Sequence, residues 1–372
     1  MRVAFFTECY RPVYNGVVAS IDALQTGLRA QGVEVTTIAP HMPHAPAGER
    51  EVVRIPSLPL PTPTGYRLCV PYLNAADRER LRGVDVVHAH SAFVTGWMAA
   101  AFARRHRLPL VFTYHTRLDA YAHYAPFERA TTERAMIALT RAYAGAADAV
   151  IVPTASIERR LRELGVRAPI AVVASAIDVA RFAAGRRSPE LRALLGAAGD
   201  EPLALVVARL GREKNVELAL DAVARSPGIR LAVVGDGPHR GALEERSRRE
   251  GIAQRVCFVG ALPPEKMPDV YASADAFLFP SLTETQGLVL AEAMAAGLPV
   301  VAADSDVSRD VLDPGGWVAA ADAASMAAAL EAAFARGRDQ SAVHLAYSRF
   351  SMEVQSQQIL ALYRGLLAAR AA

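Results

Sequence analysis

The sequence has few cysteines and no apolar run long enough to cross a membrane. Its three cysteines, Cys9, Cys69 and Cys257, lie far apart without CxxC spacing, so we expect free thiols in a reducing cytoplasm and no disulfide framework. The apolar stretch from Ala293 to Ala303 is too short to span a bilayer and contains glycine and proline. The first residues, MRVAFFTECYRP, hold too short an apolar run for a signal peptide.

Several catalytic motifs are also missing. The chain has no GxxxxGK[ST] phosphate loop, no GxSxG elbow and no HExxH pair, which excludes the usual P-loop, serine-hydrolase and zinc-protease readings. Its 372 residues are 52% apolar and 21% charged, a composition typical of a globular protein. This length predicts two domains of about 150–200 residues each.

Lysine is nearly absent, because Lys214 and Lys266 stand against 39 arginines. The net charge of +3 is unevenly placed. Residues 1–185 hold 21 Arg against 15 acids (+6), and residues 186–372 hold 20 Arg and Lys against 23 acids (−3). A basic first half is typical of a protein that binds an anionic surface, although a charge difference of this size can also arise by chance.

Apolar runs alternate with helical stretches along the whole chain. The runs lack polar alternation, which is typical of parallel strands buried on both faces. We therefore expect an α/β protein with doubly wound parallel sheets. Strands are expected at 2–7, 33–39, 84–88, 110–114, 149–152, 170–173, 203–207, 231–234, 256–259, 276–279 and 299–302.

The alternation of expected strands and helices is interrupted by an irregular stretch and begins again near residue 203. This predicts a first domain of residues 1–180 and a second of residues 181–350, with a hinge around 174–190. Residues 351–372 form a last helix that has to dock elsewhere, and we expect it to pack back on the first domain. The segment 40–71 holds eight prolines, which leaves little room for regular helix.

Two cations follow the strand at 203–207. In ARLGREKN, Arg209 and Lys214 lie either side of Gly211, just before a helix. Cations there oppose the helix dipole, and an anionic ligand would remove that conflict. A diphosphate fits, with arginine as the planar fork and lysine as the point charge.

Two acids follow the strand at 276–279. Glu284 lies in the loop and Glu292 lies inside the next helix, which begins at Gly287. The N–H groups of Gly287 and Leu288 point out of the helix start, ready for an oxygen. This suits a ligand with hydroxyls at both ends and phosphate between them, which is the shape of a nucleotide-sugar.

Other strand-end residues give weaker signals. Gly16 precedes a helix, and His115 stands at the carboxyl end of the strand at 110–114. Gly235 opens a GxGxxxG turn, which we interpret as a tight strand-to-helix turn, since no acid follows the next strand as a dinucleotide site requires. We expect no metal at the HxH of residues 88–90. Asp304-Ser-Asp306 resembles a DxD motif, but we interpret it as ordinary chain-turning polar sequence.

Together these motifs resemble retaining glycosyltransferase family 4. Glu284 and Glu292 match its EX7E signature, and the chain also carries matching phrases over residues 203–303, namely ARLGREKN, VGDGP, FVGAL and ASADAFLFPS. The resemblance covers nearly the whole chain. It implies a GT-B fold, in which two Rossmann-like domains face each other across a cleft and a C-terminal helix crosses back.

The resemblance also implies roles for individual residues. Glu284 would hold the sugar hydroxyls, Glu292 the ribose, and Arg209 and Lys214 the leaving diphosphate. His115 would lie beside the anomeric centre, so the catalytic set is His115, Glu284, Arg209 and Lys214. The remaining donor-binding candidates are Gly16, Gly235, Val259, Gly287 and Leu288. Family members need no metal, so no cofactor is expected.

Within the family, the first half resembles bacterial glucosyltransferases that act on diacylglycerol. The phrases TYHTRLDAYAHY and TETQGLV carry this resemblance, the second because Gln286 replaces the commoner phenylalanine. It implies UDP-glucose or a related UDP-hexose as donor and a lipid acceptor. The protein would be cytoplasmic and peripheral on the anionic inner leaflet. Arginine clusters at 104–107 and 159–167 are candidates for this contact, although a solvated helix face explains each equally well, and the 40–71 segment would be an acceptor or membrane flap.

The sequence departs from the family pattern at two places. The usual hinge phrase appears as ASAID (174–178), and the glycine-rich loop after residue 302 is ADSDVSRD.

Several alternative functions also stay open. Phosphatidylinositol or a soluble sugar could replace diacylglycerol as acceptor. A nucleotide-sugar epimerase shares the architecture but would need a different acid and base arrangement. An NAD oxidoreductase and a non-catalytic scaffold fit less well, and nothing indicates nucleic-acid binding.

Overall fold

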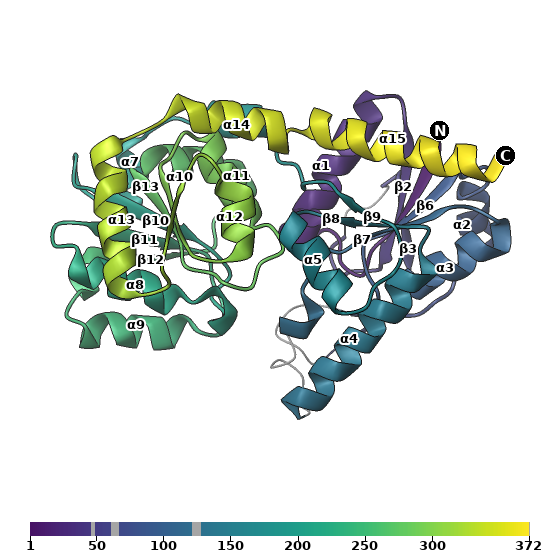
Figure 1. Ribbon diagram of the computed structural model, residues 1–372, viewed down its shortest axis with the longest axis horizontal. Coiled ribbons are helices and arrows are strands. Elements are labelled where there is room, and N and C mark those ends of the chain that lie inside the picture. The colour runs from purple at the N-terminus through teal and green to yellow at the C-terminus, as the bar shows by residue number, and fades with distance from the viewer. Residues whose placement is uncertain (46–48, 61–66, 121–127, 372) are drawn as a thin grey trace. The chain divides into compact units, whose positions relative to one another are not determined.

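The computed structural model describes residues 1–45, 49–60, 67–120 and 128–371. The chain forms two compact units (Figure 1). One consists of Met1–Ala176 with Met352–Ala372, and the other of Ile177–Ser351. The sequence-based boundary at 180/181 falls inside helix α6 (Val179–Ala183), which packs on helices α10, α11 and α14 of the second unit.

The first unit is built on a seven-stranded parallel sheet. Its strand order is β3-β2-β1-β6-β7-β8-β9. The strands are β1 (Arg2–Phe6), β2 (Glu34–Pro40), β3 (Val52–Ile55), β6 (Val86–Ala89), β7 (Leu110–Thr113), β8 (Ala149–Val152) and β9 (Ile170–Val172). The sequence missed β3, because this short strand lies inside the proline-rich segment. The prolines nearest to β3 lie outside the strand, at positions 46 and 56, so they remove no hydrogen bond from the sheet.

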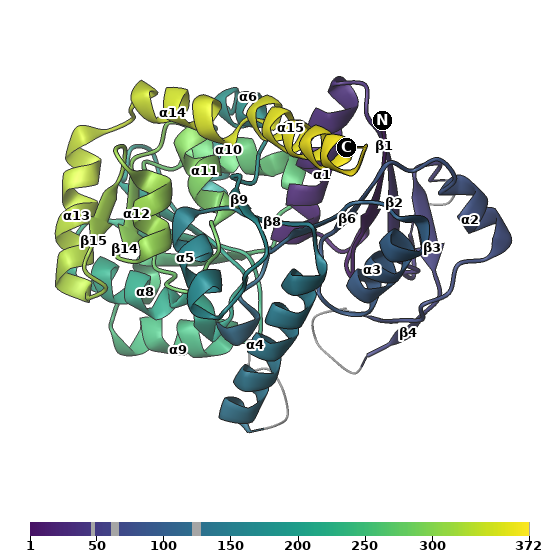
Figure 2. The same cartoon turned by 45° about the vertical axis from the view of Figure 1, so that its right-hand side comes forward.

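Six helices accompany this sheet within the described residues. They are α1 (Gly16–Ala30), α2 (Ala75–Arg80), α3 (Val94–His106), α4 (Arg129–Ala146), α5 (Ala155–Glu163) and α15 (Met352–Ala371). The last of them is the C-terminal helix, which crosses and packs against α1 (Figures 1 and 2).

A glycine allows the close approach of α1 and α15. A Cβ atom on Gly27 would lie 2.5 Å from the carbonyl oxygen of Met352, so no larger residue fits there without moving a helix. Beside it, the Gln31 side chain donates a hydrogen bond of 2.6 Å to the Ser356 hydroxyl. Apolar side chains of α15, including Ile359 and Tyr363, then join the core over β1.

The second unit is built on a six-stranded parallel sheet with order β12-β11-β10-β13-β14-β15. The strands are β10 (Leu203–Val207), β11 (Arg230–Val234), β12 (Val256–Gly260), β13 (Ala276–Phe279), β14 (Val300–Ala303) and β15 (Trp317–Ala319). Its α-helices are α6, α7 (Pro189–Leu194), α8 (Val216–Arg225), α9 (Arg240–Arg249), α10 (Met267–Ser273), α11 (Leu288–Ala295), α12 (Asp306–Leu312), α13 (Ala323–Arg336) and α14 (Gln340–Phe350).

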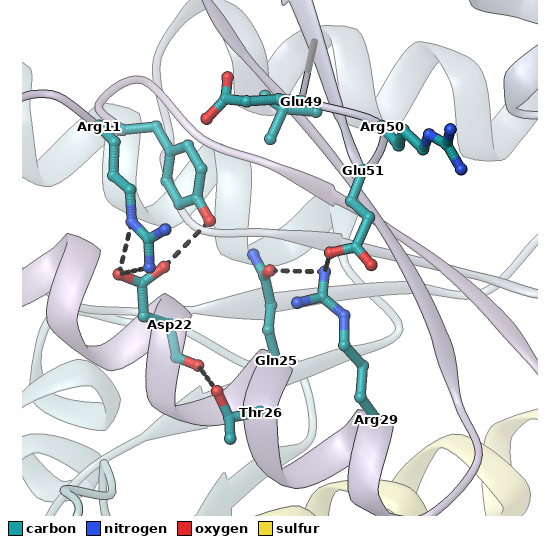
Figure 3. Close-up of a pocket in the computed structure, with 10 residues that line it drawn as sticks. Arg11, Asp22, Gln25, Thr26, Arg29, Glu49, Arg50 and Glu51 are labelled. Carbon is teal, nitrogen blue, oxygen red and sulfur yellow. Dashed lines mark hydrogen bonds and ion pairs between the residues drawn. The ribbon is translucent and has the colours of Figure 1, made fainter. Parts of the chain in front are cut away.

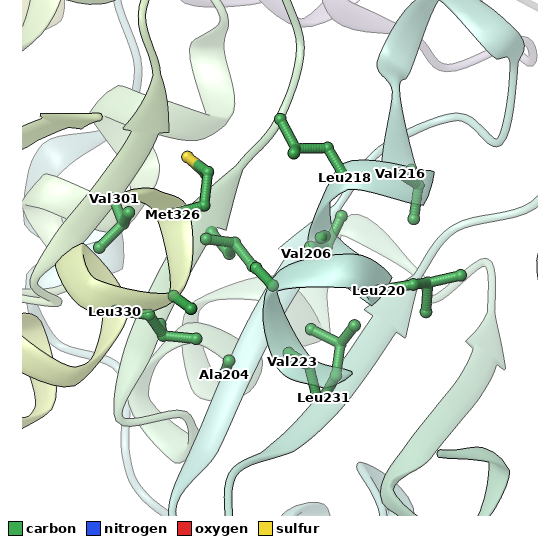
Figure 4. Close-up of a cluster of buried hydrophobic side chains, with 14 of the residues drawn as sticks. Ala204, Val206, Val216, Leu218, Leu220, Val223, Leu231, Val301, Met326 and Leu330 are labelled. Carbon is green, nitrogen blue, oxygen red and sulfur yellow. The ribbon is translucent and has the colours of Figure 1, made fainter. Parts of the chain in front are cut away.

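Helical periodicity explains how this second sheet is covered. On α13 the buried side chains Met326, Ala327, Leu330 and Ala333 recur at helical spacing and pack with those of α8 over the strands (Figure 4). The strand residues beneath are fully buried, as the apolar runs predict. The α/β class with doubly wound parallel sheets is therefore confirmed.

A small antiparallel hairpin follows β3. Its strands are β4 (Ser57–Pro59) and β5 (Arg67–Cys69). Of the expected 40–71 flap, residues 46–48 and 61–66 lie outside the described part of the chain. Leu58 pairs directly with Leu68. Leu60 and Val70 come directly after the two strands. All four are exposed, as is Tyr72.

Candidate functional site

The loop between β10 and α8 positions the two candidate cations. After Arg209 the chain forms a short 3₁₀ turn, Arg212–Lys214. Arg209 forms an ion pair with the buried carboxylate of Glu213. Gly211 leaves room for this pair, since a Cβ atom there would lie 2.4 Å from Glu213 Oε2. The sequence did not reveal Glu213 as the partner of Arg209.

The loop between β13 and α11 brings Glu284 to Lys214. The two side chains form an ion pair and are only 19% and 16% exposed. The Ser281 hydroxyl also donates to Glu284 Oε1 at 3.3 Å. The structure thus joins the residue expected to bind diphosphate and the residue expected to hold the sugar, and each offsets the desolvation cost of the other.

Further hydrogen bonds fix the two loops against each other. Thr283 donates through its hydroxyl to the Glu213 carbonyl at 3.1 Å, and the Asn215 side chain donates to the Pro280 carbonyl at 3.2 Å. Because β10 and β13 are neighbouring parallel strands, both loops leave the same edge of the sheet, where ligands of open α/β sheets bind.

Helix α11 begins beside this ion pair. It starts at Leu288, one residue later than the sequence predicts, and Gly287 is its N-cap with φ 76°. A side chain at Gly287 would be strained by this backbone and would also lie 2.9 Å from the Phe279 ring. As a glycine, the N-cap residue contributes no side-chain cap, and the first N–H groups of a helix are suited to bind a ligand oxygen.

Glu292 lies further along α11 and is held by a neighbouring helix. The Tyr271 hydroxyl of α10 donates to Glu292 Oε2 at 2.6 Å. Burial raises the pKa of Glu292 to about 6, although the tyrosine hydrogen bond opposes the shift. Burial makes the ionised carboxylate unfavourable, and hydrogen bonds donated by hydroxyl groups stabilise it. Its ribose-binding role stays a prediction, and Tyr271 is a partner that the sequence did not indicate.

The glycines after β11 form a tight turn, as the sequence analysis predicts. Gly235 has φ 128°, and a Cβ atom on it would lie 1.9 Å from the Ala208 carbonyl oxygen. Its N–H donates to the Gly260 carbonyl at 2.8 Å, next to Val259 at the end of β12. The turn therefore packs against the loop that carries Arg209, and it brings Gly235 and Val259 to the same edge of the sheet.

Asp304 and Asp306 form a local charge cluster. Both bind Arg309, at 2.7 Å and 2.9 Å, and Ser305 caps α12 by accepting the Ser308 N–H at 3.0 Å. These contacts agree with the interpretation of this stretch as chain-turning sequence. Within the described residues no cluster of three or more His, Cys, Asp or Glu side chains is arranged to hold a metal ion.

In the first unit, Gly16 and His115 lie at the carboxyl ends of β1 and β7. Gly16 is the first residue of α1, and the Asn15 side chain accepts the Val18 N–H at 3.0 Å. His115 Nε2 lies 2.9 Å from Nδ1 of His90. Burial lowers the pKa of His115 to about 4, so the imidazole is neutral at physiological pH. The sequence gave no indication of the pairing with His90.

A separate pocket of about 260 Å³ opens in the first unit between α1 and the chain before β3 (Figure 3). It holds none of the candidate residues. Its charged side chains pair with one another: Arg11 binds Asp22 at 2.8 Å, and Arg29 binds Glu51 at 2.5 Å. The Tyr10 hydroxyl also donates to Asp22 at 3.0 Å. With its charges satisfied internally, this pocket offers little to an ionic ligand.

Nothing in the described helices could serve as a transmembrane span, as none combines the length and the hydropathy required. Exposed arginines 104, 105 and 107 follow one another at the end of α3. In the second arginine cluster, Arg160 binds Asp119 and Glu163, and Arg162 binds Glu158. Two of the four arginines of the second cluster are therefore engaged within the protein, while Arg159 and Arg167 are exposed.

Two family models match the chain. One, described as glycosyl transferases group 1, matches residues 188–345, and the other, described as Glycosyltransferase Family 4, matches residues 14–181. The first model covers the Lys214–Glu284 pair, and the second covers Gly16 and His115.

Similar proteins were found among curated sequences and solved structures. The chain is 31% identical over 332 residues to an alpha-monoglucosyldiacylglycerol synthase of Acholeplasma laidlawii, covering 85% of this chain and 83% of that protein. It is 32% identical over 322 residues to a GDP-mannose-dependent alpha-mannosyltransferase of Mycobacterium tuberculosis, covering 84% and 82%. The structure of sucrose-phosphate synthase from Thermosynechococcus elongatus superposes with a TM-score of 0.79 at 23% identity, over 99% of each chain.

Proposed function

Because the chain belongs to glycosyltransferase family 4 and has its two-domain GT-B fold, we propose that it is a retaining hexosyltransferase. It takes a hexose from a nucleotide-diphosphate sugar, UDP-glucose or a related UDP-hexose, and transfers it to a lipid hydroxyl, that of diacylglycerol. The reaction takes place at the inner face of the membrane.

One observation supports the donor chemistry above all others, namely the ion pair of Lys214 and Glu284 beside the start of α11. In the free enzyme the two charges satisfy each other. When the donor binds, Lys214 exchanges its carboxylate partner for the diphosphate, and Glu284 accepts hydroxyl protons of the sugar. The helix N-terminus between them adds N–H donors for phosphate oxygens.

The leaving diphosphate gains negative charge as its bond to the sugar breaks. Lys214 and Arg209 stabilise that charge, which is the work that a metal ion does in other transferases. The acceptor hydroxyl attacks from the face that the phosphate leaves, its proton passes to the departing phosphate oxygen, and the anomeric configuration is retained. His115 is assigned to the reacting sugar, and Gly16 to the phosphate.

The lipid acceptor is supported by two independent features. One is the 31% identity to a synthase of a glucosylated diacylglycerol. The other is the group of exposed aliphatic side chains at the β4–β5 hairpin, in which Leu58 pairs with Leu68 and each strand is followed by a further exposed residue, Leu60 or Val70. A soluble acceptor gives no reason to expose four aliphatic side chains together. Phosphatidylinositol or a soluble sugar is the alternative acceptor, and the GDP-mannose-dependent relative is similar to this chain although it uses another donor.

Incubation with UDP-glucose alone and then with diacylglycerol tests the proposed function. We expect UDP release and a glucosylated lipid only when diacylglycerol is present, and an unchanged rate in EDTA. Mass spectrometry identifies the lipid, and phosphatidylinositol and glucose serve as parallel acceptors. A glycosylated product from phosphatidylinositol or glucose, with none from diacylglycerol, would show that diacylglycerol is not the acceptor. Interconversion of the donor without acceptor would instead support an epimerase.

The exposed aliphatic side chains of the hairpin predict membrane affinity. The double variant Leu58→Ser, Leu68→Ser should lower binding to anionic vesicles by at least ~10-fold, because each buried leucine contributes about 1.5–3 kcal/mol. Leu194→Ser, which removes a similarly exposed leucine from α7 of the other unit, is the matched control and should bind normally. Vesicle co-sedimentation measures both. Equal binding by the double variant and the wild type would exclude the hairpin as the membrane contact.

A further inference from the structure

Three histidines and a threonine share one face of the first sheet. β6 pairs with β7 so that His88 lies beside Val111 and Ala89 beside Phe112. Since side chains alternate, His88 and His90 project from the same face as Thr113 and His115. The Tyr363 side chain of α15 joins them there, as part of the core that covers this face.

These side chains form a continuous series of contacts. His88 Nδ1 lies 2.6 Å from the Tyr363 hydroxyl, and its Nε2 lies 2.6 Å from the Thr113 hydroxyl. The His90 ring stacks on His88 at 4.3 Å and on His115 at 5.2 Å. Both ring nitrogens of His88 are thus engaged, so this residue holds the His90 ring in a fixed plane.

Burial keeps all three imidazoles neutral. It lowers the pKa of His88 to about 3, that of His115 to about 4, and that of His90 well below its usual range. Each ring therefore carries one proton. In the contact between His90 Nδ1 and His115 Nε2, one nitrogen donates and the other accepts.

The other nitrogen of His90 decides the direction of this hydrogen bond. His90 Nε2 is buried and has no hydrogen-bond partner among the residues that the structure describes. If His90 accepted at Nδ1, its proton would lie on Nε2 as an unpaired buried N–H group, which is the rarer and costlier case. If His90 donates from Nδ1, its Nε2 keeps only a lone pair. His115 then accepts at Nε2 and carries its own proton on Nδ1.

We propose that His90 is a positioning residue that fixes His115 as the Nδ1-protonated tautomer. His115 then carries its proton on Nδ1, while its Nε2 lone pair is engaged by His90 and cannot remove a proton. The donor role rests on the proposed function, in which a bound sugar oxygen near the reacting centre becomes the acceptor of the Nδ1–H group. His115 acts as a donor in the reaction and never as its general base.

Long-range ¹H–¹⁵N NMR of the histidine-labelled protein tests the tautomer directly. His115 is assigned by comparison with the His115→Gln variant. We expect the wild-type His115 to be protonated at Nδ1. In His90→Phe, which keeps a flat ring but removes the donor, the Nε2-protonated form should appear. His90→Asn places an amide N–H near the position of Nδ1 and should retain the wild-type tautomer.

Activity adds a second measurement. His90→Phe should lower kcat by at least ~10-fold with little change in KM for the donor, and His90→Asn should recover most of the loss. An Nε2-protonated wild-type His115 would overturn the inference, as would an unchanged tautomer in a folded His90→Phe. The wild-type tautomer needs no His90 variant and no substrate, only the His115→Gln spectrum for its assignment. It therefore stands if a His90 variant does not fold and if the enzyme proves to act on another substrate.

Discussion

Glu284→Gln is expected to lower kcat for hexose transfer by about 10²- to 10³-fold. Glutamine has nearly the same size and can still accept the Ser281 hydrogen bond, but it lacks the charge that pairs with Lys214. Because Glu284 lies in a loop outside the hydrophobic core, the fold should be kept. Initial rates with UDP-glucose, together with thermal unfolding, measure both effects.

The control for Glu284→Gln is Glu331→Gln, which removes an exposed acid from α13 of the same unit. It should leave the rate unchanged. A folded Glu284→Gln variant that turns over at nearly the wild-type rate would exclude Glu284 from sugar recognition.

Lys214→Met is expected to lower kcat by a similar factor of about 10² to 10³. Unlike Glu284→Gln, it should change the affinity for UDP as well as that for UDP-glucose. Lys214 faces the diphosphate in the proposed complex, so its loss should weaken binding of UDP as well as UDP-glucose. Glu284→Gln should weaken only UDP-glucose, because UDP has no sugar for it to hold. Isothermal titration with both ligands separates the two roles.

The chain supplies a matched control for this variant, since Lys266 is its other lysine and is exposed beyond β12. Lys266→Met should behave as wild type. Because Lys214 and Glu284 are in contact, the double variant should lose less than the sum of the single losses. Full additivity, or unchanged UDP binding in Lys214→Met, would contradict the exchange of partners.

The sheets could be predicted from the sequence because their strands are continuous apolar runs. Leu203–Val207 and Ala276–Phe279 were placed without error, since a run buried on both faces carries no competing pattern. Short strands such as β3 and β15 were missed. Val52–Ile55 lies among prolines, and Trp317–Ala319 spans only three residues, so neither differs from a loop in local composition.

Most of the candidate residues could be found because they lie at or after the end of a strand, but their partners could not be predicted. Lys214 and Glu284 are 70 positions apart, and His88 and Tyr363 are 275 positions apart. Such contacts depend on sheet order and helix docking, which no local pattern encodes. Gly287 is an intermediate case, since a glycine before an apolar helix indicates a turn but not the Phe279 ring that excludes a side chain.

The anomeric configuration of the product tests the central claim most directly. UDP-glucose carries its phosphate in the α configuration, so a retaining transferase must yield an α-linked glucosyl lipid. Proton NMR of the lipid formed from UDP-glucose and diacylglycerol reads this from the coupling of the anomeric proton. An α-glucosyl diacylglycerol is the predicted result, and a β-linked product or the absence of any glucosylated lipid would contradict it.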